Sequence, residues 1–239
     1  MRAGGTAQYM NKSHIKWRQQ SGFSLVELFI AMTVTLVIMA IASTLLASSF
    51  YVRTRESQRS SAIADAQRAL NILSREIANA GYGLSTNGIV SGGDSGATSI
   101  RIRSDLDLSG VTNGSGEDVK YVLVNDANGS FIVRLNLQPT QTTGLIANRI
   151  DGLAIYYYDR RVTYTIGNCQ VGNCDITNVR NSAGNVQAEV TPDTAKYIVL
   201  SLRVTLPAVG SAGSAGYQPP SATQLVSTVT LRNANLTTY

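Results

Sequence analysis

The sequence predicts an α+β protein in which one long N-terminal helix packs against a C-terminal antiparallel β-sheet. Three observations support this prediction. Residues 24–80 contain neither proline nor glycine. The first part of this stretch is apolar on all sides, and the second part carries an apolar stripe at helical spacing. After residue 83 the composition shifts to Gly, Ser, Thr, Asn and Val, which is typical of strands joined by turns.

The basic character of the chain belongs to its first 22 residues. That segment holds four of the 20 basic residues and no acidic one, so 16 basic and 15 acidic residues remain from residue 23 onward. The nearly neutral remainder gives no compositional support for nucleic-acid binding. The one histidine, His14, also lies in the basic segment. Histidine-dependent triads and histidine-ligated metals are therefore excluded for residues 23–239.

Residues 28–50 form an apolar run without a charge. Its length is sufficient to cross a hydrocarbon core of about 30 Å at about 1.5 Å per residue. A core helix of a soluble domain is the alternative, but the length and composition favour a membrane span. Glu27 stands at the head of this run, and we expect it to find a partner, since a carboxylate in hydrocarbon costs at least about 2.5 kcal/mol. Charges decide little about orientation, because Arg53, Arg55 and Arg59 follow the run closely.

Residues 53–80 continue the predicted helix with an amphipathic pattern. Apolar side chains recur at steps of three and four: Ile63, Ala66, Leu70, Leu73, Ile77 and Ala80. We expect this stripe to pack on the sheet, and Gly81 and Gly83 to end the helix. A coiled-coil stalk is the alternative, which the shortness of the stripe and its alanines disfavour.

The C-terminal body, residues 81–239, is expected to consist mainly of strands. The predicted strands are 99–102, 118–125, 131–137, 149–158, 161–166, 196–206 and 224–231. The second and third read as a hairpin across the turn DANGS. In the last two, apolar and polar residues alternate, which predicts that each buries one face only. About 150 residues are enough to form such a core.

A loop after residue 104 begins like a calcium-binding loop. The first, third, fifth and sixth places are filled by Asp105, Asp107, Ser109 and Gly110. The twelfth place falls on Gly116, however, and the acidic Glu117 comes one residue late with no helix following. An ordinary polar loop is therefore favoured.

Three consecutive tyrosines, residues 156–158, allow an adhesive aromatic patch or core packing. Alternation in a strand buries either Tyr157 or its two neighbours, so core packing is favoured. No set of nucleophile, base and orienting group is recognisable in the sequence. We therefore expect no enzyme activity, no cofactor and no metal.

The sequence Gly22-Phe23-Ser24-Leu25-Val26-Glu27-Leu28 resembles the class III signal of type IV prepilins and type II secretion pseudopilins. The resemblance implies that a prepilin peptidase cleaves between Gly22 and Phe23 and that Phe23 is then N-methylated. We further predict that Glu27 pairs with the new amine of Phe23, on a neighbouring subunit. A start at Met10 would leave a 13-residue leader, closer to the usual length in this family.

The resemblance also implies a division of the chain in the manner of a pilin fold. A leader peptide at 1–22 is followed by the transmembrane and assembly half of the helix at 23–52. The amphipathic half at 53–80 then leads into a β-rich periplasmic domain at 81–239. The protein would cross the inner membrane once and, after assembly, lie in the pilus at the cell surface.

Four further segments are similar to PilW-type minor pilins: QRALNILSREIANAGYG, NRIDGLAIYYYD, KYIVLSLRVTLP and TVTLRNANL. The implied function is to initiate or prime a type IV pilus through the N-terminal helix. The implied partners are prepilin peptidase, the major pilin, other minor pilins and the inner-membrane assembly platform. Two alternatives stay open, a minor pseudopilin J of type II secretion and a membrane-tethered adhesin. Many major pilins carry a proline or glycine in the apolar half of the helix, and this sequence does not.

Cys169 and Cys174 enclose the four residues QVGN. In a periplasmic domain, two cysteines this close are expected to form a disulfide. The small loop limits its entropic contribution to about 2 kcal/mol. Two free thiols or half of a metal site are the alternatives.

Overall fold

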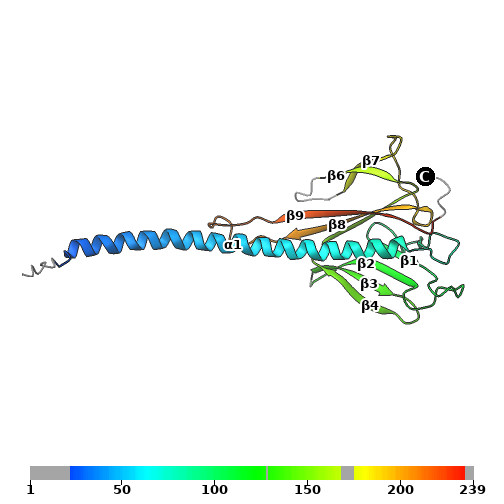
Figure 1. The fold of residues 1–239 in the computed structure, drawn as a ribbon, viewed down its shortest axis with the longest axis horizontal. Helices are drawn as coiled ribbons and strands as arrows, with labels where there is room; N and C mark the ends of the chain where they lie inside the picture. The colour runs from blue at the N-terminus through cyan, green and yellow to red at the C-terminus, as the bar shows by residue number, and fades with distance from the viewer. Residues whose placement is uncertain (1–21, 128, 168–174, 235–239) are drawn as a thin grey trace, which may run out of the picture. The chain divides into compact units, whose positions relative to one another are not determined.

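The computed structural model describes residues 22–127, 129–167 and 175–234. Residues 1–46 and residues 47–239 form two separate units. The observed architecture confirms the predicted α+β class, with one long N-terminal helix and antiparallel β-sheets (Figure 1).

Helix α1 spans Leu25–Ala78, 54 residues, without a break. It ends where the glycines were expected to end it, through a turn in which the Ala80 N–H donates to the Ile77 carbonyl at 3.0 Å. Gly81 then adopts a φ of 76°, and a Cβ at this position would lie 2.5 Å from the backbone oxygen of Thr86. The left-handed backbone and the close approach of the chain both require glycine here.

In the first unit, every described residue from 22 to 46 is exposed. The hydroxyl groups of this apolar helix segment donate to carbonyls three or four residues earlier. Two examples are Thr35, which donates to Ala31 at 2.7 Å, and Ser43, which donates to Met39 at 2.8 Å. These bonds leave few polar groups unsatisfied, so the segment is compatible with hydrocarbon around it.

In the second unit, α1 packs through a stripe that differs from the predicted one in one respect. Ala66, Leu70, Leu73, Ile77 and Ala80 are buried as expected, but Ile63 is only half-buried. The neighbouring positions Ala62 and Ala69 are buried instead. The buried stripe thus consists of small alanines at 62, 66, 69 and 80 together with the larger Leu70, Leu73 and Ile77.

The described strands are antiparallel, as predicted, and they are divided among three sheets where one was expected. One sheet has the order β1-β2-β3-β4, another β5-β8-β9, and the smallest pairs β6 with β7. Their bounds are β1 Ser99–Arg103, β2 Asp118–Asp126, β3 Gly129–Asn136, β4 Thr142–Asn148, β5 Gly152–Tyr158, β6 Val162–Ile166, β7 Ile176–Asn181, β8 Tyr197–Leu206 and β9 Ser221–Thr230. The β2–β3 hairpin is confirmed, with Asp126 paired opposite Gly129. A 3₁₀ turn, η1 Pro192–Thr194, precedes β8.

Two of these strands, β4 and β7, were not predicted. Both lie at the edge of a sheet. Most of β4 and half of β7 are exposed, and neither carries the apolar alternation by which strands are recognised. Their pairing comes from neighbours in space, β3 for β4 and β6 for β7.

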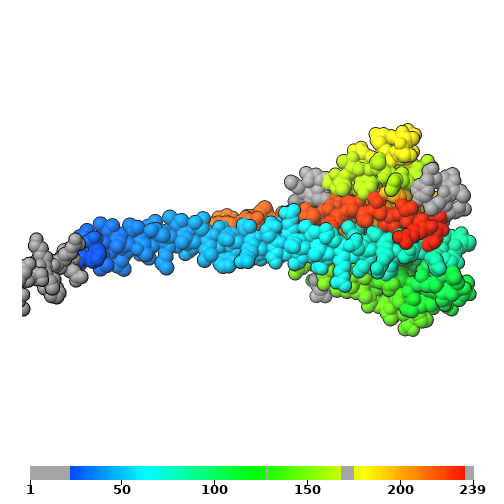
Figure 2. Space-filling model, viewed as in Figure 1, coloured from blue at the N-terminus to red at the C-terminus, as the bar shows by residue number. Residues whose placement is uncertain are grey.

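Sheets lie on two sides of the second half of α1. In Figure 1, β8 and β9 run on one side of this helix segment and β1 to β4 on the other. The Ser74 and Ser227 hydroxyls lie 3.1 Å apart, which joins α1 to β9, and Figure 2 shows the two segments side by side. On the other side Glu76 pairs with Arg134 of β3 at 3.2 Å.

The predicted one-sided burial of the last two strands was wrong. The first six residues of β8, from Tyr197 to Leu202, are all buried, and most of β9 is half-buried on both faces. Ile198, Leu200 and Leu202 belong to the main core with α1. Tyr197 and Val199 face the opposite way, into a second cluster built with residues of β5, β6 and β7. The β6–β7 hairpin therefore covers the face that was expected to meet water.

Candidate processing and assembly site

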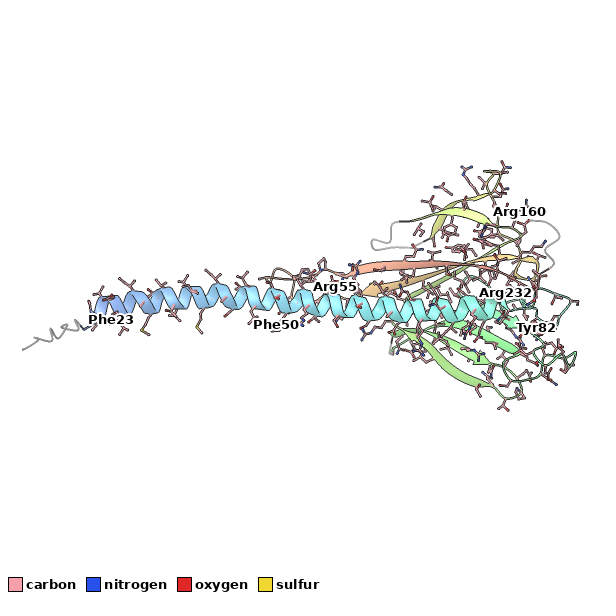
Figure 3. The ribbon with its side chains drawn as sticks, in the orientation of Figure 1. Phe23, Phe50, Arg55, Tyr82, Arg160 and Arg232 are labelled. Atoms are coloured by element: carbon pink, nitrogen blue, oxygen red, sulfur yellow. The ribbon has the colours of Figure 1, made fainter. Side chains whose placement is uncertain are left out.

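The proposed processing site precedes the first turn of α1. Gly22, Phe23 and Ser24 are exposed and not helical, and Phe23 is 83% exposed. A Cβ placed on Gly22 would meet no atom within 4 Å. Figure 3 shows Phe23 at the beginning of the helix. The peptide bond after Gly22 thus lies in accessible, non-helical chain.

Glu27 lies in the first turn of α1. Its carboxylate is favoured there by the partial positive charge of the helix N-terminus. Ser24 directly precedes the helix, and its carbonyl accepts from the Leu28 N–H at 3.1 Å. Ser24 and Glu27 have the Ser-x-x-Glu spacing of a capping box. This spacing is a further local signal, not used in the prediction above, for the start of a helix at this point of the chain.

Glu27 is exposed, and no residue of the described ranges donates a hydrogen bond to it or forms an ion pair with it. The Glu27 carboxylate is therefore available to a group that lies outside the described residues. The surrounding side chains are apolar and exposed, among them Leu25, Leu28 and Ile30. An apolar surface on all sides of a helix is stable only against lipid or other helices.

In the second unit, a half-buried polar contact joins helix α1 to the sheet that contains β2 and β3. Arg134 of β3 lies between Glu76 of α1, with which it pairs at 3.2 Å, and the Tyr121 hydroxyl, to which its Nε donates at 3.3 Å. Burial raises the pKa of Tyr121, and the Glu76 carboxylate raises it further. The phenol is therefore neutral at every ordinary pH, and the contact acts as a fixed link.

The loop that resembled a calcium site brings its acids together. Carboxylate oxygens of Asp105, Asp107 and Glu117 lie within 4.8 Å of one another. The backbone of the same loop already satisfies them, since Asp105 accepts from the Ser109 and Gly110 N–H groups at 2.9 and 2.8 Å. Glu117 accepts from the Gly114 N–H at 2.6 Å and the Leu106 N–H at 2.8 Å.

This geometry agrees with the favoured interpretation, an ordinary polar loop. Hydrogen bonds from the Ser109 hydroxyl and backbone N–H lower the pKa of Asp107, so the carboxylate stays ionised and holds the turn. The cluster is explained as a network that closes the loop on itself.

The three tyrosines are used mainly in packing, but not as simple alternation predicts. Tyr157 and Tyr158 are both buried, at 3% and 2% exposure, and Tyr156 is half-buried. Tyr157 enters the main core and its hydroxyl donates to the Gly96 carbonyl at 3.1 Å. Tyr158 enters the second cluster on the opposite face. Core packing is confirmed, and burial on a single face is wrong because both faces of β5 are covered.

The predicted disulfide between Cys169 and Cys174 lies outside the described residues. It stays a prediction.

Helix α1 is long and apolar enough to cross a membrane, and it is the one such helix among the residues that the structure describes. Comparison with known protein families matches residues 17–43 to the prokaryotic N-terminal methylation motif. Comparisons with curated proteins and with solved structures give no match. The matched segment contains Gly22, Phe23, Glu27 and the first part of the apolar run. The chain thus carries a prepilin-like class III signal that continues into a single apolar helix, and this supports a type IV pilin-like or pseudopilin protein with one membrane anchor.

Proposed function

We propose that this chain is a minor pilin that helps to initiate type IV pilus assembly through its N-terminal helix. The observation that carries the proposal is the continuity of the methylation motif with an unbroken apolar helix whose described residues 22–46 are all exposed. In a single chain this surface has no protein partner, so the membrane covers it before assembly and helices of other subunits cover it afterwards.

The proposal assigns a sequence of events to the N-terminal residues. Prepilin peptidase cleaves between Gly22 and Phe23 and methylates the new amine of Phe23. Before this step the amine does not exist, because its nitrogen is part of a peptide bond. Cleavage thus creates a positive charge four residues before Glu27, at the same end of the helix.

Electrostatics then favour a single register between neighbouring helices. Glu27 in hydrocarbon costs at least about 2.5 kcal/mol if it stays unpaired, and a buried ammonium has a similar cost. Pairing with the Phe23 amine of a neighbouring subunit offsets part of both penalties. A shift of one helical turn, about 5.4 Å, would separate the two charges. The absence of a partner for Glu27 within the described chain is consistent with this role.

Two features favour a minor subunit over a bulk one. The apolar half of α1 contains no proline or glycine, whereas many major pilins carry such a breaker in this half. The four segments named above are similar to PilW-type minor pilins. We accordingly place the β-domain in the periplasm and name the major pilin, other minor pilins and the inner-membrane assembly platform as partners.

A pseudopilin of a secretion system is the alternative, and it would use the same helix and the same methylation motif as a minor pilin. An adhesin based on the tyrosines is less well supported, since Tyr157 and Tyr158 are buried. Deletion of the gene with counting of surface filaments by electron microscopy tests the proposal. We expect far fewer filaments. Normal filaments with impaired protein secretion would instead identify a pseudopilin, and normal filaments with impaired adhesion would identify an adhesin.

The residue that the mechanism depends on most is Glu27. We expect Glu27→Gln to abolish rescue of filament number in the deletion strain, although the precursor is still made and inserted. Glu56→Gln is the matched control, since Glu56 is an exposed acid of the same helix beyond the apolar run. Equal rescue by both variants would refute the pairing.

A further inference from the structure

We propose that the loop between β8 and β9, residues 207–220, enters the headgroup layer of the membrane beside α1. The β-domain would then contact lipid at a second place, next to its own anchor. This inference depends on the membrane span and holds equally for a pilin and for a pseudopilin.

Both ends of the loop are fastened to α1 by one arginine. Arg55 is 7% exposed. Its guanidinium donates to the Pro207 carbonyl at one end of the loop, and to the Pro219 carbonyl at 2.8 Å and the Ser221 hydroxyl at 2.7 Å at the other. Figure 3 shows Arg55 on α1 where β8 ends. Arg55 was predicted only as one of the charges that follow the span, whereas its guanidinium is buried and donates its hydrogen bonds to this loop and to the first residue of β9.

Beyond Arg55 the loop continues along α1 to Tyr51 and Ser48, which belong to the same unit. A Cβ on Gly210 would lie 3.6 Å from the Tyr51 ring, and one on Gly216 would lie 2.5 Å from the Ser48 Cα. Gly216 also has a φ of 82°, so two independent features require glycine there. The two arms stay paired, since Val209 and Gln218 exchange backbone hydrogen bonds at 3.0 and 2.9 Å.

The position of Ser48 sets the depth of the loop. Ser48 lies within the uncharged run 28–50, before its last residue. Arg53 is the first charge after the run, five residues beyond Ser48, or about 7.5 Å along a helix. An interfacial layer is about 5–8 Å thick on each side of the hydrocarbon core. A segment that touches both Ser48 and Tyr51 therefore lies within this layer.

The composition of the loop suits that layer. Its sequence, PAVGSAGSAGYQPP, contains no charged residue and consists largely of Gly, Ala, Ser and Pro. Tyr217 and Tyr51 are both half-buried near the end of the span, and tyrosine is enriched at the membrane interface. The loop is also far longer than the two to five residues that join most hairpins. Its exposed backbone groups would be unsatisfied in hydrocarbon, so the headgroup layer is the depth at which it stops.

Tryptophan quenching by brominated lipids measures this contact in the full chain reconstituted into phosphatidylcholine vesicles. The one natural tryptophan, Trp17, lies in the leader and is replaced by phenylalanine. Single tryptophans are then introduced by Tyr217→Trp in the loop, Tyr51→Trp beside it, and Tyr82→Trp just beyond the far end of α1. Tyr82 follows Tyr51 by roughly 40 Å of helix, which places it outside any bilayer contact.

We expect the emission of Tyr217→Trp to be quenched about as strongly as that of Tyr51→Trp, and that of Tyr82→Trp to be unaffected. Quenching should be stronger with bromines close to the headgroup than with bromines deep in the acyl chains. Quenching of Tyr51→Trp without quenching of Tyr217→Trp would overturn the proposal.

Release of the loop provides a second test. Arg55→Ala should lower the quenching of the tryptophan emission when it is combined with Tyr217→Trp. When it is combined with Tyr51→Trp, the quenching should be unchanged, because the helix stays inserted. If Arg55→Ala prevents folding, the second test uses Ser214→Trp instead, a tryptophan reporter at an exposed position of the loop in a chain that keeps Arg55. Absence of quenching in that variant would also contradict the inference.

Discussion

Asp118 of β2 is the acceptor at the centre of an ion-pair cluster, and its replacement by alanine is expected to destabilise the β-domain by about 3 kcal/mol. Its side chain is 3% exposed. It accepts from the Arg101 Nε and Nη2 atoms at 2.7 Å each and from the Arg103 Nε at 3.0 Å. Burial alone would raise the pKa of Asp118, but the hydrogen bonds and charges of both arginines outweigh it and hold this pKa below its usual value.

The magnitude follows from what the substitution leaves behind. Removing one partner of a buried ion pair costs about 3–5 kcal/mol, since the other charge stays buried without compensation. Arg101 is 18% exposed and keeps a second bond, to Asp94 at 2.8 Å, which places the cost at the lower end of this range. The matched control is Asp94→Ala. Asp94 is 33% exposed, so its loss should cost only about 0.5–1 kcal/mol.

Urea unfolding of the intact chain in detergent, followed by tyrosine circular dichroism, measures both values. The reasoning would be refuted if Asp118→Ala were no more damaging than Asp94→Ala. A double variant, Arg101→Met with Asp118→Leu, should recover most of the stability, because apolar residues can replace a buried ion pair at little cost.

Three further predictions concern other parts of the chain. Gly81→Ala should destabilise the protein by at least about 1–2 kcal/mol, since the backbone φ at Gly81 is 76°. Gly96→Ala is the control and should leave the thermal midpoint unchanged, because no atom lies within 4 Å of the added Cβ. Because the pKa of Asp118 is lowered on folding, the stabilisation by its carboxylate is complete above the ordinary aspartate pKa of about 3.9 and disappears as the pH falls through the folded value. The difference in urea midpoint between the native chain and Asp118→Asn should therefore close only below about pH 4. A difference that closes between pH 7 and 5 would argue against this ion pair. Cys169 and Cys174 should bind a thiol reagent only after reduction, and two labels without reduction would exclude the disulfide.

Those features that depend on local order along the chain could be predicted from the sequence. The helix from Leu25 to Ala78 follows from the absence of proline and glycine, and its end follows from Gly81. The β2–β3 hairpin follows from two β-rich runs on either side of an Asn-Gly turn. Gly22, Phe23 and Glu27 were recognised because their spacing is a linear signal, which the match at residues 17–43 supports.

Features that depend on what lies opposite a residue could not be predicted in this way. β4 and β7 lack a pattern of their own, because an edge strand receives its hydrogen bonds from a neighbour and leaves most of its side chains in water. The alternation in β8 predicted a wet face, but the β6–β7 hairpin covers it with Val162 and Ile176. Arg55 was read as a charge near the membrane, and its burial became visible only when residues more than 150 positions later were placed beside it.

The sequence by itself thus determined the long apolar helix, the N-terminal methylation motif and the α+β class of this protein. Each of these is encoded in neighbouring residues, through hydropathy, helix breakers and a short motif with fixed spacing. The tertiary structure alone decided the division into three sheets, the two-sided burial of β8 and the position of the β8–β9 loop beside Ser48. These depend on contacts between segments far apart in the chain, whose free energy is gained only when both partners meet, and so no single segment records them.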